Sequence, residues 1–210
     1  MRVLVTAGPT REPLDPVRYL SNRSSGRMGY AVARALLRAG HKVVLVTGPT
    51  ALRPPAGASV VRVETAREML AACRRHWRNC DAVVAVAAVA DWRPARAAAV
   101  KLKRGDAATT LELVANPDIL ATLARTKGRR LAVGFALESG DGRQEAWRKL
   151  RGKNLDAIVL NGPRAQGAAR ATLQLLRADG GEARLGPAAK EVLARRLVRC
   201  LFGPRRSPKV

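Results

Sequence analysis

The sequence predicts an α/β fold in which helices cover a mostly parallel sheet. Apolar runs of strand length alternate with helical patterns along the chain, which is the order that produces βα units. Consecutive positions in these runs are apolar, so helices are expected on both faces of the sheet, in a Rossmann-like three-layer arrangement. The expected strands are residues 3–6, 42–46, 60–63, 82–87, 131–135 and 157–160.

Signals for helix starts and ends fall between these runs. Thr65 is followed three residues later by glutamate, the spacing of a capping box, which predicts a helix start at Thr65. Asn116 before Pro117 predicts a second start, with the asparagine as the cap and the proline in the first turn. Gly40 and Gly128 are predicted to end helices, because glycine readily adopts the left-handed conformation found at many helix ends.

Two long segments interrupt the alternation, and connections of this length in an α/β domain are more often functional than accidental. The first, residues 88–110, is basic. The second, residues 161–184, contains one short run of strand character at residues 172–176. Residues 203–210 are predicted to form a disordered basic tail, which leaves a single predicted domain over residues 1–202 of the 210-residue chain.

The chain has a formal net charge of +23, so a nucleic acid or another polyanion has to be considered as a partner. The charge is spread evenly, since 19 of the 39 Lys and Arg residues lie in residues 1–105. Aromatic residues make up 3% of the chain, which leaves few rings to stack on bases. Specific nucleic-acid binding is therefore not expected, and an enzyme that handles multiply charged phosphates also fits the charge.

Other features favour a cytoplasmic protein. The longest apolar run, residues 82–90, is far shorter than the about 20 residues of a membrane span, so no membrane association is expected. The N-terminus reaches a turn at Gly8 too early for a signal peptide. Cys73, Cys80 and Cys200 form no CxxC pair and are expected to be reduced structural thiols rather than metal ligands.

The connection after the first expected strand, between Ala7 and Gly29, is predicted to bind an anion. It follows the carboxyl end of a strand, where ligands bind in open α/β sheets. Ser24 and Gly26 lead into a helix whose first N–H groups and dipole would favour a phosphate. The two glycines alone are weak evidence, because glycine also serves helix–sheet packing and turns.

Residues 6–33, with the core PTREPLDPVRYLSNRSSGRMG, closely resemble the family of phosphopantothenate–cysteine ligase, also called phosphopantothenoylcysteine synthetase, of coenzyme A biosynthesis. Other segments resemble the same family in order and at similar spacing, so the resemblance covers nearly the whole chain. These segments are residues 87–94, 101–103, 116–119, 134–136 and 149–156.

The resemblance implies a ligase that joins 4'-phosphopantothenate to L-cysteine. In the bacterial type, CTP activates the substrate carboxylate as an acyl-cytidylate with release of pyrophosphate, and the cysteine amine then displaces CMP. Since the mixed anhydride supplies the leaving group, the protein mainly positions the reactants and stabilises charge. Mg²⁺ is expected to bridge the phosphates, with no protein ligand assigned to it, and a homodimer is expected. Residues 172–176 are expected to add a strand across the interface of that dimer.

By the same resemblance, three side chains are expected to carry the chemistry. Asn22 contacts the reacting acyl group, Arg18 lies close by on the anionic substrate, and Lys101 compensates phosphate charge. Without the family, Asn22 could simply cap the following turn, and Lys101 would be part of a solvated charge run.

A larger set of residues resembles the nucleotide site of the family. Lys149 and Lys153 lie four residues apart on one helix face, where like charges repel unless an anion sits between them; the alternative is one more exposed basic face. Phe135 would otherwise be ordinary strand core. The expected nucleotide-binding residues are Gly8, Ser24, Gly26, Gly29, Ala85, Val86, Ala87, Asp91, Lys101, Asn116, Pro117, Asp118, Ile119, Phe135, Lys149 and Lys153.

The sequence departs from the family in a few places. Gly162 replaces the acidic member of an Asn-Asp pair, Val100 replaces a glutamate before Lys101, and the connection after Asn161 is short. These changes concern the lid and the dimer contacts more than the chemistry. Bacterial members are commonly fused to a flavin-dependent decarboxylase, which the sequence lacks. We therefore expect this protein to catalyse ligation alone and to bind no flavin. We expect a separate phosphopantothenoylcysteine decarboxylase to act beside it.

Two other classes of protein share some of these sequence features. An NAD(P)-dependent reductase on a Rossmann-like fold is disfavoured because the turn at residues 7–10 is not GxGxxG, and neither Tyr19 nor Tyr30 has a lysine four residues later. A non-catalytic basic nucleic-acid-binding protein would show affinity that falls steeply with salt and would release no pyrophosphate.

Overall fold

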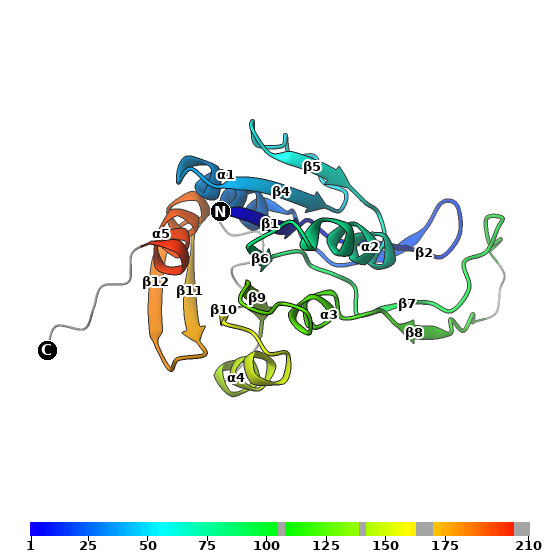
Figure 1. Ribbon diagram of the computed structural model, residues 1–210. Coiled ribbons are helices and arrows are strands. Elements are labelled where there is room, and N and C mark those ends of the chain that lie inside the picture. The colour runs from blue at the N-terminus through cyan, green and yellow to red at the C-terminus, as the bar shows by residue number, and fades with distance from the viewer. Residues whose placement is uncertain (105–107, 139–141, 163–169, 204–210) are drawn as a thin grey trace, which may run out of the picture.

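The structure, a computed structural model, describes residues 1–104, 108–138, 142–162 and 170–203 (Figure 1). The main sheet comprises β1 (Arg2–Ala7), β4 (Lys42–Thr47), β5 (Ser59–Arg62), β6 (Ala82–Ala85), β9 (Leu131–Leu137), β10 (Ala157–Asn161), β11 (Arg170–Arg177) and β12 (Glu182–Ala189). The helices are α1 (Arg27–Arg38), α2 (Ala66–Trp77), α3 (Ile119–Ala124), α4 (Gly142–Gly152) and α5 (Lys190–Phe202). Two small pairs complete the elements: β2 (Arg11–Pro13) with β3 (Tyr19–Ser21), and β7 (Trp92–Pro94) with β8 (Leu113–Ala115).

The eight strands of the sheet follow the order β12-β11-β10-β9-β6-β1-β4-β5. The strands from β10 to β5 are parallel, and β11 and β12 extend the sheet in antiparallel pairing. Alternate residues of β1 face different helix layers: Val3 and Val5 pack in the cluster of α1 and α5, and Leu4 packs in that of α2, α3 and α4. The α/β, Rossmann-like fold with a mostly parallel sheet is therefore confirmed.

The expected strands all lie in the main sheet, with changes at their ends. The strand expected at residues 82–87 ends at Ala85, where the N–H of Ala87 donates to the Thr6 hydroxyl at 3.2 Å; pairing resumes only as an isolated bridge between Pro9 and Ala88. Residues 172–176 lie in β11, as expected, but β11 pairs with β10 on one side and β12 on the other. The expectation that this segment adds a strand across a dimer is therefore wrong, because both of its edges are used within the chain.

Helix ends agree with the sequence in part. Thr65 caps α2, its hydroxyl accepting from the N–H of Glu68 at 3.2 Å, and Gly40 follows the end of α1 with φ of 81°. The prediction of Asn116 as a cap is wrong, since α3 begins after Asp118, whose carboxylate accepts from Ala121 N at 2.9 Å. Gly128 ends no helix, because α3 stops four residues earlier at Ala124.

Cys73 and Cys80 are buried among apolar side chains. Burial raises the pKa of the Cys73 thiol to about 12, so this thiol is neutral at physiological pH. Within the described ranges, no helix is long and apolar enough to cross a membrane.

Gly29 sets the distance between α1 and β1. A β-carbon added at Gly29 would lie 2.5 Å from the β-carbon of Ala7 and 3.2 Å from the carbonyl oxygen of Thr6. A side chain would therefore push the first turn of α1 away from the strand.

Replacing Gly29 with Ala is expected to lower the free energy of unfolding by about 1–3 kcal/mol, because the added methyl group overpacks this contact. Guanidinium denaturation measures the change. Gly152→Ala is the matched control, since a β-carbon there meets nothing within 4 Å, and it is expected to leave stability unchanged or slightly higher. Equal stability of the two variants would contradict the packing role of Gly29.

Candidate active site

A pocket opens at the carboxyl ends of the parallel strands, where α1 begins. Its walls come from the loop into α1, from the ends of β6, β9 and β10, and from the start of α5. The lining residues are 24–29, 86–88, 135–137, Asn161 and Lys190. The predicted anion site thus lies at an open edge of a parallel sheet, where such folds bind ligands.

The first turn of α1 presents backbone N–H groups to this pocket. Gly26 precedes the helix with φ of 74° and no side chain caps it. The first intrahelical hydrogen bond runs from Tyr30 N to Gly26 O, which leaves the N–H groups of residues 27–29 without an acceptor in the helix. The first turn contains no acidic residue, so the positive end of the helix dipole is open to an anion.

Gly8 and Gly26 let two loops touch through their backbones. Both have φ of 74°, and a β-carbon on Gly26 would lie 3.3 Å from Gly8 Cα. One on Gly8 would lie 3.0 Å from the carbonyl oxygen of Gly48. Gly8 does not line the pocket, so its place in the fold is to shape the turn after β1.

Asn22 joins the loop after β1 to the loop after β6. Its side-chain amide donates to the carbonyl oxygens of Ala88 at 3.2 Å and Val89 at 3.0 Å. The alternative that Asn22 caps the next turn is therefore wrong. Thr10, fully buried, reinforces the same junction by accepting from Ala90 N at 2.9 Å.

Arg18 is held by Asp15 and by the segment that carries Lys101. Its guanidinium donates to the Asp15 carboxylate, with Nε at 2.9 Å, and to the carbonyl of Leu102 at 2.7 Å. Asp15 also accepts from the N–H of Leu102 at 3.2 Å. The Arg18 guanidinium, helped by backbone N–H groups, holds the pKa of the buried Asp15 carboxyl well below its usual range. Lys101 itself is exposed.

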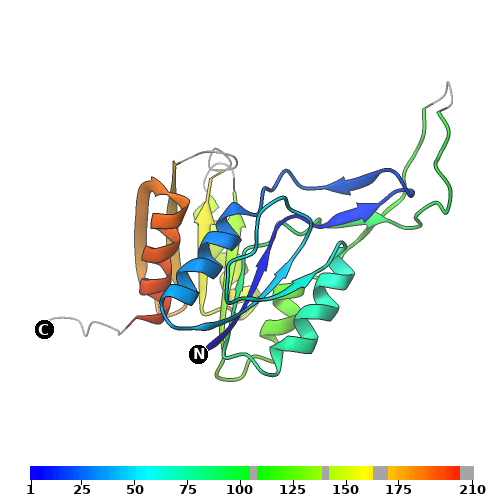
Figure 2. The same ribbon diagram turned by 90° about the horizontal axis from the view of Figure 1, so that it is seen from above.

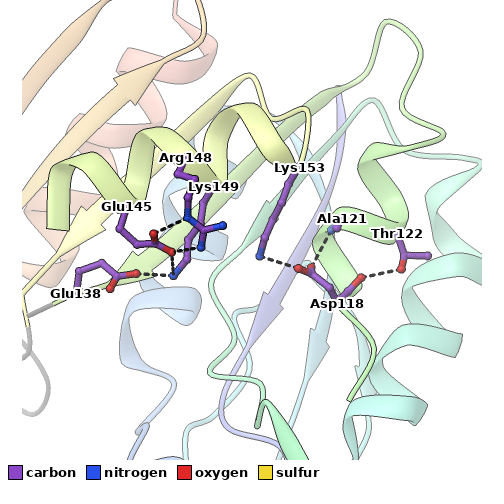
Figure 3. Close-up of polar contacts among 8 residues, drawn as sticks. All are labelled: Asp118, Ala121, Thr122, Glu138, Glu145, Arg148, Lys149 and Lys153. Carbon is purple, nitrogen blue, oxygen red and sulfur yellow. Dashed lines mark hydrogen bonds and ion pairs between the residues drawn. The ribbon is translucent and has the colours of Figure 1, made fainter. Parts of the chain in front are cut away.

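Lys149 lies on α4 and Lys153 directly follows the end of this helix, with its N–H donating to the carbonyl of Lys149 at 3.0 Å; each lysine meets a carboxylate (Figure 3). Lys149 Nζ lies 2.5 Å from Glu138 Oε1 and 3.6 Å from Glu145 Oε1. Lys153 Nζ lies 2.7 Å from the Asp118 carboxylate, which also caps α3. Burial opposes ionisation, but the two glutamates together raise the pKa of Lys149. Acidic side chains of the chain itself thus balance the two lysines.

The family model described as the DNA/pantothenate metabolism flavoprotein C-terminal domain matches residues 1–203. The chain belongs to this family. CoaBC, the coenzyme A biosynthesis bifunctional protein, of Mycobacterium tuberculosis (strain ATCC 25618 / H37Rv) is 43% identical over 215 residues, which cover 94% of this chain and 51% of that protein. CoaBC of Bacillus subtilis (strain 168) is 44% identical over 167 residues, covering 79% of this chain and 41% of that protein.

A solved structure supports the same assignment. The crystal structure of the C-terminal domain of CoaBC matches with a TM-score of 0.83 at 40% identity, over 95% of this chain and 93% of that chain. The chain spans about half the length of the curated relatives it matches. This chain therefore corresponds to the C-terminal domain of these relatives.

Only some of the predicted nucleotide-binding residues of this chain line the pocket. Six of them line it: Ser24, Gly26, Gly29, Val86, Ala87 and Phe135. Phe135 is thus a pocket residue as well as part of β9. Ala85 ends β6 just before this wall.

The other predicted residues lie outside the pocket lining. Asn116 N donates to Asp91 O at 2.8 Å and its side-chain amide to Ala90 O at 2.9 Å, so Asn116, directly after β8, is bonded to the loop after β6 that carries Asp91. Pro117 follows in the connection to α3, and Ile119 is buried in the core. Gly8, Arg18, Asn22, Lys101, Asp118, Lys149 and Lys153 are placed as described above.

Sequence reasoning missed three residues near the site. Arg27 and Lys190 line the pocket, and Thr10 supports the loop junction. Arg27 stands within the PTREPLDPVRYLSNRSSGRMG motif and could have been chosen from it. No local signal marks Lys190, which reaches the site only because α5 packs beside α1.

Asp15→Asn is expected to weaken the domain at neutral pH, because the Arg18 guanidinium loses its carboxylate. The pKa of Asp15 is lowered in the folded state, so its stabilising contribution is complete above its unfolded pKa of about 3.9 and is lost as pH falls further. The stability gap between wild type and variant should therefore stay constant from pH 7 to about pH 4 and narrow below that. Urea denaturation across pH measures the gap.

Asp179→Asn serves as the control, because the Asp179 carboxylate accepts from the N–H of Gly181 in an exposed turn and forms no ion pair with any residue that the structure describes. A gap that widens on acidification would contradict the role given to Asp15.

Proposed function

We propose that residues 1–202 form a phosphopantothenate–cysteine ligase domain, which joins 4'-phosphopantothenate to L-cysteine in coenzyme A biosynthesis. The observation that carries the proposal is the uncapped N-terminus of α1, which opens onto a pocket at the carboxyl ends of the strands in a member of this family. The 40% identity to the C-terminal domain of CoaBC, over 93% of that chain, supports it.

The proposed reaction has two steps. A carboxylate oxygen of 4'-phosphopantothenate attacks the α-phosphorus of CTP, the bond to the bridging oxygen breaks, and pyrophosphate leaves with its electron pair. The cysteine amine then attacks the acyl carbon of the acyl-cytidylate, the acyl C–O bond breaks, and CMP leaves while the nitrogen loses a proton. Fixed donors at the sites of developing charge lower the barrier of such steps.

The first turn of α1 is the proposed seat of the phosphates, since the N–H groups of residues 27–29 have no intrahelical acceptor. Phe135 and residues 86–88 form the facing wall. The proposed co-substrate is CTP, and Mg²⁺ is proposed to be held through its phosphates. In the described part of the chain, no group of three or more His, Cys, Asp or Glu side chains is placed to hold a metal ion.

Asn22 and Lys101 are proposed to act on the acyl and phosphate groups. Asn22 lies where the loops after β1 and β6 meet, which is beside the pocket wall at Ala88. Lys101 directly precedes Leu102, whose backbone the Asp15–Arg18 pair holds, and it is exposed, so its ammonium is free to reach a bound phosphate. Arg18, which is paired with Asp15, is proposed to face the anionic substrate.

Pyrophosphate release tests the function. Purified protein with phosphopantothenate, cysteine, Mg²⁺ and CTP is expected to release pyrophosphate and form phosphopantothenoylcysteine, with ATP in place of CTP as the comparison. Neither a reductase nor a nucleic-acid-binding protein would release pyrophosphate in this mixture. No release with either nucleotide would overturn the ligase proposal.

Asn22→Asp and Lys101→Gln are each expected to lower turnover about 100-fold or more, since each removes a fixed donor or cation from the reacting groups. Steady-state pyrophosphate release measures the loss, and circular dichroism checks the fold. Lys103→Gln is the control, because it removes one positive charge from the same exposed segment. Full activity of both site variants would refute their assignment.

A homodimer is proposed through an arm that projects from the main sheet (Figure 2). The arm consists of residues 11–21, 92–104 and 108–115, and carries most of the exposed large apolar side chains of the described residues. Such a patch is typical of an interaction surface. These side chains are Val17, Tyr19, Trp92, Val100, Leu102, Leu111 and Leu113. The separate decarboxylase and the cytoplasmic location stay predictions from the sequence.

Trp92→Glu is expected to convert the dimer to a monomer. Trp92 is 55% exposed in the single chain, and glutamate in its place would put a charge in the apolar interface. Light scattering coupled to gel filtration measures the mass. Leu137→Glu, which places the same charge on an exposed leucine away from the arm, is expected to keep the dimer. A wild-type mass of one chain, or an unchanged mass for Trp92→Glu, would contradict the arm as the interface.

A further inference from the structure

Lys190 brings a cation from the end of the chain to the candidate pocket. It is the first residue of α5, and its side chain lines the pocket together with the first turn of α1. α1 and α5 pack side by side on one face of the sheet (Figure 2). Every other lining residue precedes residue 162, so Lys190 alone adds a group from the C-terminal part of the sequence.

The charge of Lys190 is not balanced within the pocket. Glu191, the next residue, turns to Arg34 on α1, with 3.2 Å between the guanidinium and the carboxylate. Arg27 is a second cation in the lining, and in the ranges that the structure describes neither it nor Lys190 forms an ion pair with a carboxylate. Burial and the nearby charge of Arg27 lower the pKa of Lys190, and the charge of Glu191 offsets this shift only in part.

Other lysines of the chain do have carboxylate partners, so the excess of positive charge is specific to this pocket. Lys149 and Lys153 each lie within 3 Å of a carboxylate oxygen, so the chain neutralises them itself. Lys190 and Arg27 instead share a pocket with the open N-terminus of α1, where the dipole adds further positive potential. Two unpaired cations and free N–H groups in one pocket favour an anion of more than one charge, such as a polyphosphate.

Sheet order separates Lys190, which lines this pocket, from Asn22, which lies just outside its lining. Asn22 bonds to the loop that follows β6, while Lys190 lines the wall beside Asn161 at the end of β10. β6 and β10 are separated by β9, so their ends lie about 10 Å apart at the usual strand spacing. If the acyl group reacts near Asn22, the α-phosphate lies there, and the β- and γ-phosphates extend toward Lys190.

We propose that Lys190 binds the β- and γ-phosphates of the nucleotide and stabilises pyrophosphate as it leaves. This inference rests on the proposed ligase function and assigns one residue to its first step. When the α-phosphorus–oxygen bond breaks, the electron pair stays on the bridging oxygen of pyrophosphate, and the Lys190 ammonium lies beside the charge that forms. The second step, in which cysteine displaces CMP, does not involve this residue.

Calorimetric titration of the full chain with inorganic pyrophosphate, and separately with CMP, tests the assignment without any turnover. Lys190→Met is expected to weaken pyrophosphate binding about 10-fold or more, since a charge-assisted hydrogen bond is lost, and to leave CMP binding unchanged. Lys190→Arg is expected to retain most of the affinity. Lys42→Met, which removes one exposed charge at the opposite end of the strands, is the control for net charge.

Turnover gives a second readout. Lys190→Met is expected to slow pyrophosphate release from CTP, while amide formation from preformed acyl-cytidylate and cysteine proceeds at the wild-type rate. Pyrophosphate binding equal to that of Lys42→Met, or an equal loss of CMP binding, would overturn the role of Lys190. If wild-type protein binds pyrophosphate through Lys190 but releases none from CTP, the anion site at Lys190 stands. That result would overturn the ligase function instead.

Discussion

Helix α1 lies against strand β1 at a distance that leaves no room for a side chain at Gly29. This contact fixes where the helix begins, and the touching backbones of Gly8 and Gly26 fix the loop that leads into it. The N–H groups of the first turn therefore point to the edge of the sheet where β6, β9 and β10 end. Every other group of the candidate site is placed relative to that helix start.

Local pattern was enough to predict the buried strands and the helix that starts after Gly26, because both depend on residues that are close in sequence. Apolar runs such as that of β1 and the glycines around α1 carry this information directly. Strand β12 escaped prediction because only scattered positions of Glu182–Ala189 are buried and the run contains Gly186 and Pro187.

The rest of the site depends on contacts between distant segments, which no local pattern records. Asn116 looked like a helix cap, but its amide bonds to Ala90 and leaves the cap to Asp118. Asp15 receives no role from the local sequence, yet it holds Arg18 and the backbone at Leu102, 87 residues away. The roles of Asn22, Lys101 and the paired lysines at the end of α4 came from the resemblance to a family, and their chemistry stays a proposal.

The packing of α5 has a consequence for how the domain is made. Leu193, Leu197 and Ala194 of α5 belong to the same buried cluster as α1, so the side of α1 that packs on α5 stays uncovered until α5 has been synthesised. A nascent chain that ends before α5 would have the parallel strands and the α1 loop, but it would expose apolar surface to other chains on the ribosome. The pocket, which Lys190 lines, would thus be complete only once α5 has been synthesised and has packed on α1.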